Sequence, residues 1–477
     1  MFKKDSFVHP YIPNSVPRIK LEMLREIGVK NVEELYKEIP EKLRFKEKLN
    51  IPGPFLSEHE LKNKVTKILS KNITCEDYLN FLGGGCWQHY VPAVCDEIIS
   101  RAEFLTAYAG EVYSDVGKYQ AFFEFQSQIG ELVGMETVCL PVYSWGAAAG
   151  FSIRMASRIT KRDEVLVPKT ISPERLSTIK NFCGTNNSTQ YISMKMIDYN
   201  KKTGQIDLHD LGNKVSSKTA AIYFENPSYI GLIETQGKEI SEIANQNGSL
   251  SIVGVDPISL GVLEPPSNYG ADIIVGTIQP LGVHMNCGGG TGGFIATRDE
   301  EKYVVEYPSL LISITNTSQA GEYGFGYCTW NRTSYMGRDE NGKIKEGSKD
   351  FTGTISNLWA IAASVYMSLM GPQGFKEIGS TIIEKNAYAK KLISQIPGAK
   401  ILFPLYNFKE FVVNFDDTNK TIEEINHSLL DYKIFGGKDI SQDFPELGNN
   451  ALYCITEIHS YQDIQKLVDS LKEVLIK

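Results

Sequence analysis

The chain has 477 residues, of which 42% are hydrophobic and 22% are charged, and its formal net charge at pH 7 is −8. This balance excludes an intrinsically disordered chain, which needs low hydrophobicity with high net charge, and it argues against binding to nucleic-acid phosphates. No apolar run approaches the roughly 20 residues of a membrane span, and no apolar segment follows Lys3 and Lys4 as in a secretory signal. We therefore expect a cytoplasmic protein with no nucleic-acid or membrane partner.

The residues that usually bind metals are scattered along the sequence. None of the eight cysteines forms a Cys-x-x-Cys pair, and none of the seven histidines belongs to a His-Glu-x-x-His motif. The sequence therefore predicts no metal site.

Residues 1–75 are predicted to form a helical N-terminal arm. Apolar side chains recur at helical spacing over residues 19–27, Gly28 ends this run, and a second helix is indicated over residues 58–71. A segment this short and this charged cannot bury a core of its own. We expect the arm to pack on something larger.

Residues 76–330 are predicted to form a large α/β domain with a mostly parallel sheet. Short apolar runs alternate with amphipathic segments, which is typical of parallel βαβ units with helices on both faces of the sheet. The predicted strands cover residues 138–142, 164–167, 190–197, 219–225, 251–255, 273–276 and 293–296. The predicted helices cover residues 92–108, 118–133, 147–159, 173–182 and 237–246.

Residues 331–477 are predicted to form a small C-terminal α+β domain. A helix over residues 357–370 ends at Gly371-Pro372, a pair that stops helices. The predicted strands that follow cover residues 400–403, 410–414 and 451–455, and the predicted helices cover residues 375–396, 422–430 and 460–474.

Ligands of such sheets bind beyond the carboxyl ends of the strands, and three of these ends carry candidate residues. Ser144 and Gly146 open a helix whose N–H groups suit a phosphate, although small residues there equally allow close packing on the sheet. Asp256 ends an apolar strand before Pro257, where an aspartate holds the pyridinium N–H of pyridoxal phosphate (PLP) or caps a turn. Gln279 follows the next strand.

These three strand ends, in this order, fit the large domain of the aspartate-aminotransferase-like PLP fold, fold type I. In that fold a lysine one strand beyond the aspartate forms the Schiff base with the cofactor. The sequence has no lysine between Lys238 and Lys302, and the expected position falls near Gln279-Pro280. The chain therefore either is no PLP enzyme or is a PLP-fold subunit without the lysine.

Motifs spread over nearly the whole chain carry a family resemblance. With them the chain resembles the α subunit of the two-subunit P-protein of the glycine cleavage system, a glycine dehydrogenase (decarboxylating). The matching motifs are Tyr11-Ile-Pro-Asn14, Met23-Leu-Arg-Glu-Ile-Gly-Val-Lys30, Glu33-Glu-Leu-Tyr-Lys-Glu-Ile-Pro40, Phe81-Leu-Gly-Gly-Gly85, His89-Tyr-Val-Pro-Ala93, Asp96-Glu-Ile-Ile-Ser-Arg-Ala-Glu-Phe104, Thr106-Ala-Tyr108, Phe123-Glu-Phe-Gln126, Asp256-Pro-Ile-Ser-Leu-Gly-Val-Leu263, Tyr269-Gly-Ala-Asp272, Gln279-Pro-Leu-Gly282 and Leu369-Met-Gly-Pro-Gln-Gly374.

The resemblance implies an oxidoreductase whose function is shared between two kinds of subunit. It implies that the α subunit lacks the lysine, that the β subunit holds PLP, and that the two assemble into an α2β2 heterotetramer. The complex decarboxylates glycine and transfers the aminomethyl group to the lipoyl group of the H-protein. On this reading the present chain has no catalytic residue and no covalently bound cofactor, and Ser144, Gly146, Asp256 and Gln279 line a vestigial pocket.

Residues that contact substrate or a partner chain are also implied. His89 and Tyr108 lie in matching motifs, whereas Arg332 lies in a region that departs from the family pattern; its planar guanidinium suits a carboxylate, or serves a surface ion pair. The aromatic-rich stretch over residues 81–125 holds more rings than one core helix needs, so we expect part of it to face a partner.

Three segments depart from the family pattern and leave the substrate open. They are residues 109–118, 144–149 and 326–354. Two alternatives follow: a divergent paralogue whose complex acts on another amino acid, or a structural pseudo-enzyme without catalytic function.

Overall fold

The computed structural model of the chain divides into two compact units, Met1–Ile73 and Thr74–Lys477. It describes residues 12, 15–47, 49–53, 55, 57–105, 116–185, 191–286, 292–309, 311–327, 350, 352, 356–404 and 406–476. Among these residues, no helix combines the length and the apolar character that a membrane crossing requires. The predicted border between residues 330 and 331 lies outside the described residues, so this division remains a prediction.

The first unit consists of short helices with exposed apolar side chains. Its elements are α1 (Pro17–Ile27), the 3-10 helices η2 (Val32–Glu38) and η3 (Glu41–Leu43), and α2 (Glu58–Leu69). The end of α1 is set by Gly28, which adopts the left-handed conformation with φ 83° that glycine accepts without strain. Leu24 is the buried residue of α1, and α2 has none. The apolar stripes of both helices therefore lack a core within this unit.

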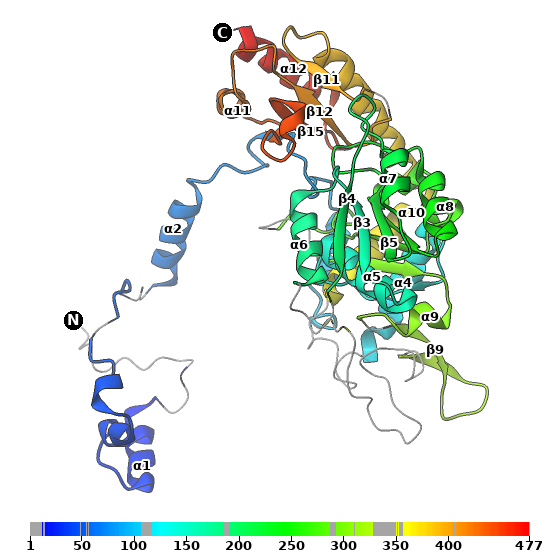
Figure 1. The fold of residues 1–477 in the computed structure, drawn as a ribbon. Coiled ribbons are helices and arrows are strands. Elements are labelled where there is room, and N and C mark those ends of the chain that lie inside the picture. Colours follow the sequence, from blue (N-terminus) through cyan, green and yellow to red (C-terminus); the bar gives the residue numbers. More distant parts are fainter. Residues whose placement is uncertain are drawn as a thin grey trace. The chain divides into compact units, whose positions relative to one another are not determined.

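The second unit is built around a seven-stranded sheet with the order β2-β8-β7-β6-β5-β3-β4 (Figure 1). The strands from β7 to β4 pair in parallel, as the sequence predicts, while β8 and β2 join antiparallel. The bounds are β2 (Thr137–Val138), β3 (Glu164–Pro168), β4 (Ser193–Ile197), β5 (Thr219–Glu225), β6 (Leu250–Val255), β7 (Ile273–Thr277) and β8 (Gly293–Thr297).

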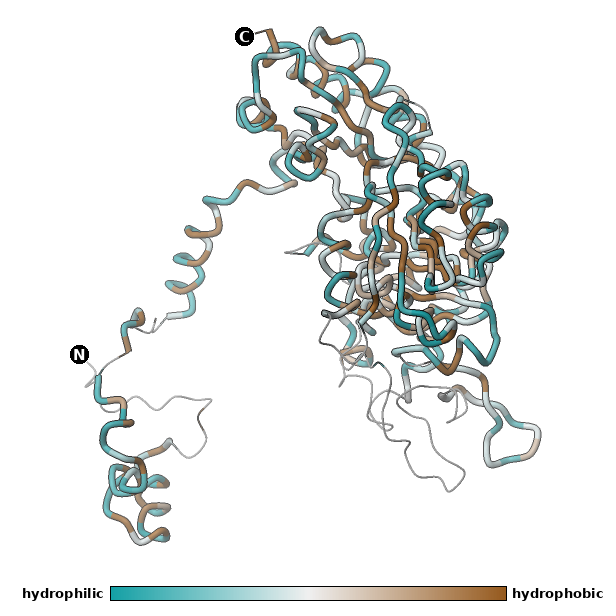
Figure 2. Tube along the Cα trace, in the orientation of Figure 1, coloured by the Kyte–Doolittle hydropathy of each residue, from teal (hydrophilic) through white to brown (hydrophobic). Residues whose placement is uncertain are grey.

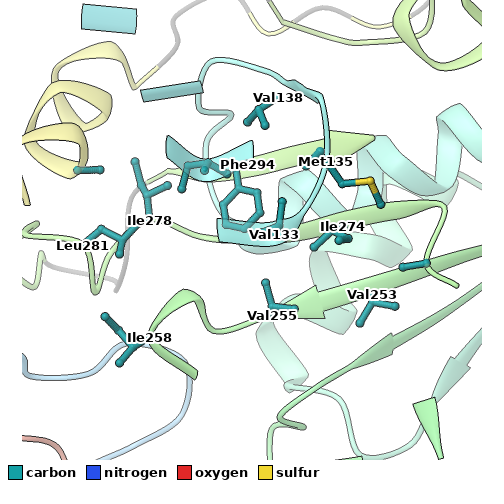
Figure 3. Close-up of a cluster of buried hydrophobic side chains, with 14 of the residues drawn as sticks. Val133, Met135, Val138, Val253, Val255, Ile258, Ile274, Ile278, Leu281 and Phe294 are labelled. Carbon is teal, nitrogen blue, oxygen red and sulfur yellow. The ribbon is translucent and has the colours of Figure 1, made fainter. Parts of the chain in front are cut away.

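Helices cover both faces of this sheet. Successive strand residues alternate between two buried clusters, with Val253 in one and Ile252 in the other. The first cluster packs against α4, α8 and α10, and the second packs against α5 and α6. Figure 3 shows part of the first cluster, including Val253, Val255 and Ile274. Hydrophobic residues accordingly concentrate on the central strands (Figure 2). The helices of the large lobe, which we define as the part around this sheet, are α3 (Ala93–Ile99), α4 (Tyr119–Val133), α5 (Trp145–Thr160), α6 (Pro173–Cys183), α7 (Leu208–Lys214), α8 (Gly237–Gln246) and α9 (Glu301–Val304).

A four-stranded antiparallel sheet with the order β11-β12-β15-β14 forms the small lobe. The long α10 (Asn357–Ile393) leads into it and breaks at Gly371, just where the sequence predicts one helix to end before another begins. The strands are β11 (Lys400–Leu402), β12 (Glu410–Asn414), β14 (Lys438–Asp439) and β15 (Asn450–Cys454), with helices α11 (Ile422–Leu430) and α12 (Tyr461–Ile476).

Short elements connect the lobes. Strand β1 (Leu79–Asn80) pairs in parallel with β13 (Ile434–Phe435), which brings the segment before α3 onto the small lobe. The 3-10 helices of this unit are η4 (Val116–Lys118), η5 (Pro257–Gly261), η6 (Pro266–Tyr269) and η7 (Pro445–Leu447).

Several predictions of local structure are wrong. The strand predicted over residues 138–142 is reduced to β2, because Pro141 has no N–H for a sheet ladder. The helix predicted from residue 92 ends at Ile99. The hairpin of β9 (Ile312–Asn316) and β10 (Tyr323–Tyr327) and the helix α7 were not predicted.

The aromatic-rich stretch over residues 81–125 belongs mainly to the core of this chain. Phe81, Trp87, Phe122 and Phe125 are buried, whereas Tyr90 is 64% exposed. Within the described part of the stretch, Tyr90 is thus the ring most available to a partner.

Candidate functional site

The carboxyl ends of β6 and β7 meet residues from the small lobe. Asp256 follows β6 and Gln279 follows β7, while Lys409 enters from the small lobe immediately before β12. The segment from Phe81 to Tyr90 lies against the same place, because its Trp87 backbone bonds to Gln279 and its His89 side chain bonds to Lys409. This is where ligands of such folds bind.

Both carboxylate oxygens of Asp256 have partners within this chain. Its Oδ1 accepts a hydrogen bond from the Ile258 N–H at 3.1 Å, so it caps η5 as one of the two roles expected from the sequence. Its Oδ2 lies 2.7 Å from the Lys409 ammonium, and the two side chains are only 5% and 2% exposed. Removing either partner of a charge pair buried this deeply would leave an uncompensated charge in the core and would strongly destabilise the fold.

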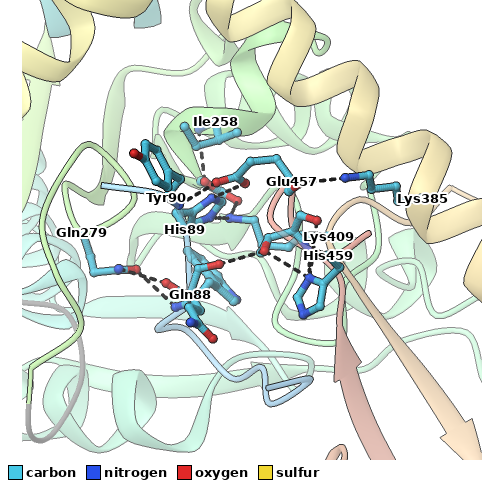
Figure 4. A network of polar contacts seen from close by, with 12 residues as sticks. Gln88, His89, Tyr90, Ile258, Gln279, Lys385, Lys409, Glu457 and His459 are labelled. Atoms are coloured by element: carbon cyan, nitrogen blue, oxygen red, sulfur yellow. Dashed lines mark hydrogen bonds and ion pairs between the residues drawn. The ribbon is translucent and has the colours of Figure 1, made fainter. Parts of the chain in front are cut away.

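Lys409 also contacts a ring and a second polar group. Its Nζ lies 3.9 Å from the centroid of the Trp87 ring and 2.8 Å from His89 Nε2. An ammonium can only donate, so His89 Nε2 accepts and the imidazole carries its proton on Nδ1. That nitrogen lies 2.7 Å from Glu457 Oε2 and donates to it. Figure 4 shows His89 between Lys409 and Glu457.

Glu457 closes this chain of contacts. Burial would raise its pKa, but the hydrogen bonds that Glu457 accepts from His89 Nδ1 and from the Tyr90 N–H at 2.8 Å outweigh burial and lower the pKa of Glu457 below its usual range. The backbone carbonyl of Glu457 accepts from Lys385 Nζ of α10 at 2.7 Å. The carboxylate therefore stays ionised and holds His89 in one orientation.

A second buried ion pair lies beside the first. Arg175 of α6 donates to both oxygens of Glu225, at 2.7 and 2.8 Å, and its guanidinium lies 4.2 Å from the centroid of the Trp145 ring. Glu410 is also buried, which raises its pKa, and it accepts from the Gly84 N–H at 2.6 Å. The Nε and Nη2 edge of the Arg175 guanidinium is thus occupied by the Glu225 carboxylate.

The space left between these groups is very small. A cavity of about 10 Å³ is lined by Trp87, Trp145, Arg175, Pro227, Ser228, Tyr229, Gly231, Asp256, Phe408, Lys409 and Glu410. That volume holds about one water molecule. A pyridine ring with its phosphate does not fit here, and the carboxylate that would hold its ring nitrogen is already paired with Lys409.

Ser144 and Gly146 have packing roles at the start of α5. The Ser144 Oγ accepts from the Ala147 N–H at 3.1 Å and so caps the helix. A side chain at Gly146 would approach Thr178 of α6 to 3.0 Å. The small residues thus serve the packing of α5 on α6, which is the alternative to phosphate binding that the sequence leaves open.

Gln279 fixes Trp87. Its Oε1 accepts from the Trp87 N–H at 3.2 Å and its Nε2 donates to the Trp87 carbonyl at 3.0 Å, and the residue is 1% exposed. Asp256, Gln279 and His89 therefore come together in one network. Tyr108 and Arg332 lie outside the described residues.

Sequence reasoning missed Lys409, Glu457 and the Arg175–Glu225 pair. One pattern carried a usable signal: Lys409 and Glu410 stand as two charges between Phe408 and Phe411 at the start of an apolar strand. Charged residues inside such a run are buried only when they are paired. Within the described residues, no group of three or more His, Cys, Asp or Glu side chains is placed to hold a metal ion.

Comparison with known proteins gives a consistent family. The family described as "Glycine cleavage system P-protein" matches residues 9–471. The "Probable glycine dehydrogenase (decarboxylating) subunit 1" of Staphylothermus marinus is 37% identical over 475 residues, which cover 98% of each chain. The protein of the same description from Pyrococcus furiosus is 38% identical over 470 residues, which cover 98% of this chain and 99% of the relative.

Solved structures agree with these relatives. A crystal structure described as glycine decarboxylase (P-protein) of the glycine cleavage system, in inhibitor-bound form, matches with a TM-score of 0.82 and 29% identity, over 98% of this chain and 100% of that chain. A sphingosine-1-phosphate lyase of Burkholderia pseudomallei shares the fold, with a TM-score of 0.63 and 14% identity, over 92% of this chain and 95% of that chain. The predicted fold class is confirmed, and the chain belongs to the glycine cleavage system P-protein family.

Proposed function

We propose that this chain is the subunit without PLP of a two-subunit glycine dehydrogenase (decarboxylating), and that the second subunit carries the cofactor. Its relatives are named as subunit 1 of that enzyme, so the chain acts in glycine decarboxylation as part of a complex. The observation that supports the placement of PLP is the buried Asp256–Lys409 pair, which occupies the carboxylate that a pyridinium nitrogen would need. The absence of lysine between Lys238 and Lys302 supports the same placement.

The remaining parts of the assembly follow from the family. In the complex, PLP on the second subunit supplies the electron sink for loss of carbon dioxide, and a lipoylated H-protein accepts the aminomethyl group. The assembly is an α2β2 heterotetramer in the cytoplasm. This chain contributes surface and positioning to it, with no catalytic residue of its own.

Each candidate residue receives a role on this proposal. Asp256, Gln279 and His89 stabilise the filled pocket, because each is committed to partners within the chain. Tyr108 and Arg332 contact substrate or the second subunit. Arg332 suits the glycine carboxylate, since its planar guanidinium can donate two parallel hydrogen bonds to the two carboxylate oxygens.

The placement of PLP is tested by preparing the chain alone, the second subunit alone and the assembled pair. We expect an aldimine absorption band at roughly 400–430 nm from the second subunit and the pair, and none from this chain. A band from this chain alone, reduced by borohydride and mapped to one of its lysines, would overturn the proposal. Decarboxylation of another amino acid in place of glycine would indicate a divergent paralogue, and an assembled but inactive pair would indicate a pseudo-enzyme.

The role of Arg332 is tested in the assembled pair by Arg332→Ala. If the guanidinium binds the substrate carboxylate, kcat/KM for glycine falls. The ratio of the two kcat/KM values should correspond to a loss of roughly 1.5–3 kcal/mol of transition-state stabilisation, the contribution of a charge-assisted hydrogen bond. Arg101→Ala removes another arginine, one that pairs with Glu103 at the surface, and should leave kcat/KM unchanged. Equal activity of both variants would show that Arg332 does not bind substrate.

A further inference from the structure

We infer that Lys409 is a built-in substitute for a cofactor, whose ammonium neutralises Asp256 and keeps the pocket at the end of β6 closed between the two lobes. The inference rests on the proposed absence of PLP from this chain. It goes beyond that proposal because it assigns a residue and a physical role to the closed pocket.

The contact geometry places a cation where a ring nitrogen would pair. Asp256 stands at the carboxyl end of β6, and Lys409 reaches it from the small lobe at 2.7 Å. The other oxygen of Asp256 already caps η5 through the Ile258 N–H. The carboxylate thus has one side available for a cation, and a residue of the same chain takes it.

Aromatic side chains occupy the rest of the space that a cofactor would need. The Trp87 ring lies 3.9 Å from the Lys409 ammonium, a distance that gives a cation–π attraction which strengthens in a dry site. Gln279 holds Trp87 through both its N–H and its carbonyl. Across the cavity, Trp145 stacks on Arg175. Two indole rings therefore fill the space that a flat cofactor ring would need, which leaves about 10 Å³.

An alternative role for Lys409 is that of a displaced Schiff-base lysine. The geometry argues against it. In PLP the carbon that bears the aldehyde lies para to the ring nitrogen, so the lysine must reach the end of the ring that points away from the aspartate. Lys409 contacts the aspartate itself. It cannot reach the aldehyde of a ring that is held by the same carboxylate.

The pair also joins the two lobes. Lys409 and Glu457 belong to the small lobe, and they contact Asp256 of the large lobe and His89 of the segment between the lobes. These contacts are supplied by side chains, so the lobes are held together without a ligand.

Chemical rescue tests this inference in the full chain. Lys409→Ala leaves a buried carboxylate without its cation, and we expect the melting temperature to fall by roughly 5–10 °C. The alanine also leaves room for a small amine, so propylammonium should restore a large part of the loss while 1-propanol should not. The matched control is Lys385→Ala, which removes an ammonium bound to the backbone carbonyl of Glu457, with no carboxylate to receive an added amine.

A charge-neutral double variant covers the case in which Lys409→Ala does not fold. Lys409→Met leaves Asp256 unpaired, whereas Lys409→Met with Asp256→Asn removes both charges, so the double variant should melt at a higher temperature than Lys409→Met. No rescue by propylammonium, together with a double variant no more stable than Lys409→Met, would overturn the role of Lys409 alone. Borohydride trapping of PLP on the unmodified chain would overturn the proposed function as well, so the two failures are distinguishable.

Discussion

Glu457 is a single carboxylate whose ionisation stabilises the fold. Its side chain is 16% exposed, and the hydrogen bonds from His89 Nδ1 and the Tyr90 N–H outweigh burial and lower the pKa of Glu457 below its usual range. A glutamate in an unfolded chain titrates at about 4.3. Because the folded-state value is the lower one, the stabilisation is complete above about pH 5 and is lost as the pH falls toward 2.

We therefore expect Glu457→Gln to lower the free energy of unfolding at pH 7 by on the order of 2–3 kcal/mol. The difference from the unmodified chain should shrink steadily below about pH 4, where the unfolded form of the unmodified chain binds a proton on Glu457 that the folded form excludes. Urea unfolding at pH 7, 5 and 3 measures this. Glu384→Gln is the control: Glu384 is exposed and accepts from the Tyr461 hydroxyl at the surface, so this variant should show little change. A difference that stays constant with pH would show that the effect of Glu457→Gln is one of packing.

At the scale of elements, the packing of α5 against α6 leaves no room for a side chain at a helical glycine. Gly150 lies in α5, where an added Cβ would approach ring carbon Cγ of Phe182 in α6 to 2.5 Å. Gly212 lies in the exposed α7 and would meet nothing within 4 Å. These two helical glycines thus differ in what surrounds them, while they share the same backbone preference.

The two glycines should respond to alanine in opposite directions. Gly150→Ala gains helix propensity but overpacks the interface with Phe182, so we expect a net loss of about 1–2 kcal/mol. Gly212→Ala gains propensity without a clash and should raise the free energy of unfolding by about 0.5–1 kcal/mol. Denaturant unfolding of both variants measures this. If both variants are stabilised, α6 shifts readily and the packing of α5 on α6 is not tight.

Most elements were predictable because their signals are local. The strand β5 and the helices α8 and α11 have the predicted bounds, since each is an apolar run or stripe with clear ends, such as the Thr421 capping box of α11. The hairpin of β9 and β10 was hidden because β10 contains Gly324 and Gly326, a residue type that is depleted in strands. In the candidate site, Asp256 and Gln279 were found from their place after strands. Lys409 was not, because it meets Asp256 only after the two lobes have packed.

At the scale of the whole molecule, the unit Met1–Ile73 carries an apolar stripe that it does not bury within itself. In α1, Leu21 is 51% exposed and Ile27 is 56% exposed, although both lie on the apolar stripe that predicted the helix. Apolar stripes on helices this short are stable only when they pack against another surface. The names of the relatives imply a second subunit, which is a ready source of that surface.

We expect the double variant Leu21→Ser with Ile27→Ser to weaken assembly with the second subunit and to leave the unit Thr74–Lys477 intact. Burying two such side chains contributes about 3–5 kcal/mol, so the Kd should rise by at least roughly 100-fold. Titration of the second subunit, followed by sedimentation or light scattering, measures the Kd, and thermal melting checks the fold. The control is Lys20→Ser with Glu26→Ser, which changes two exposed polar residues of the same helix to the same residue type. Were both double variants to bind as tightly as the unmodified chain, the stripe of α1 would serve a contact other than the subunit interface.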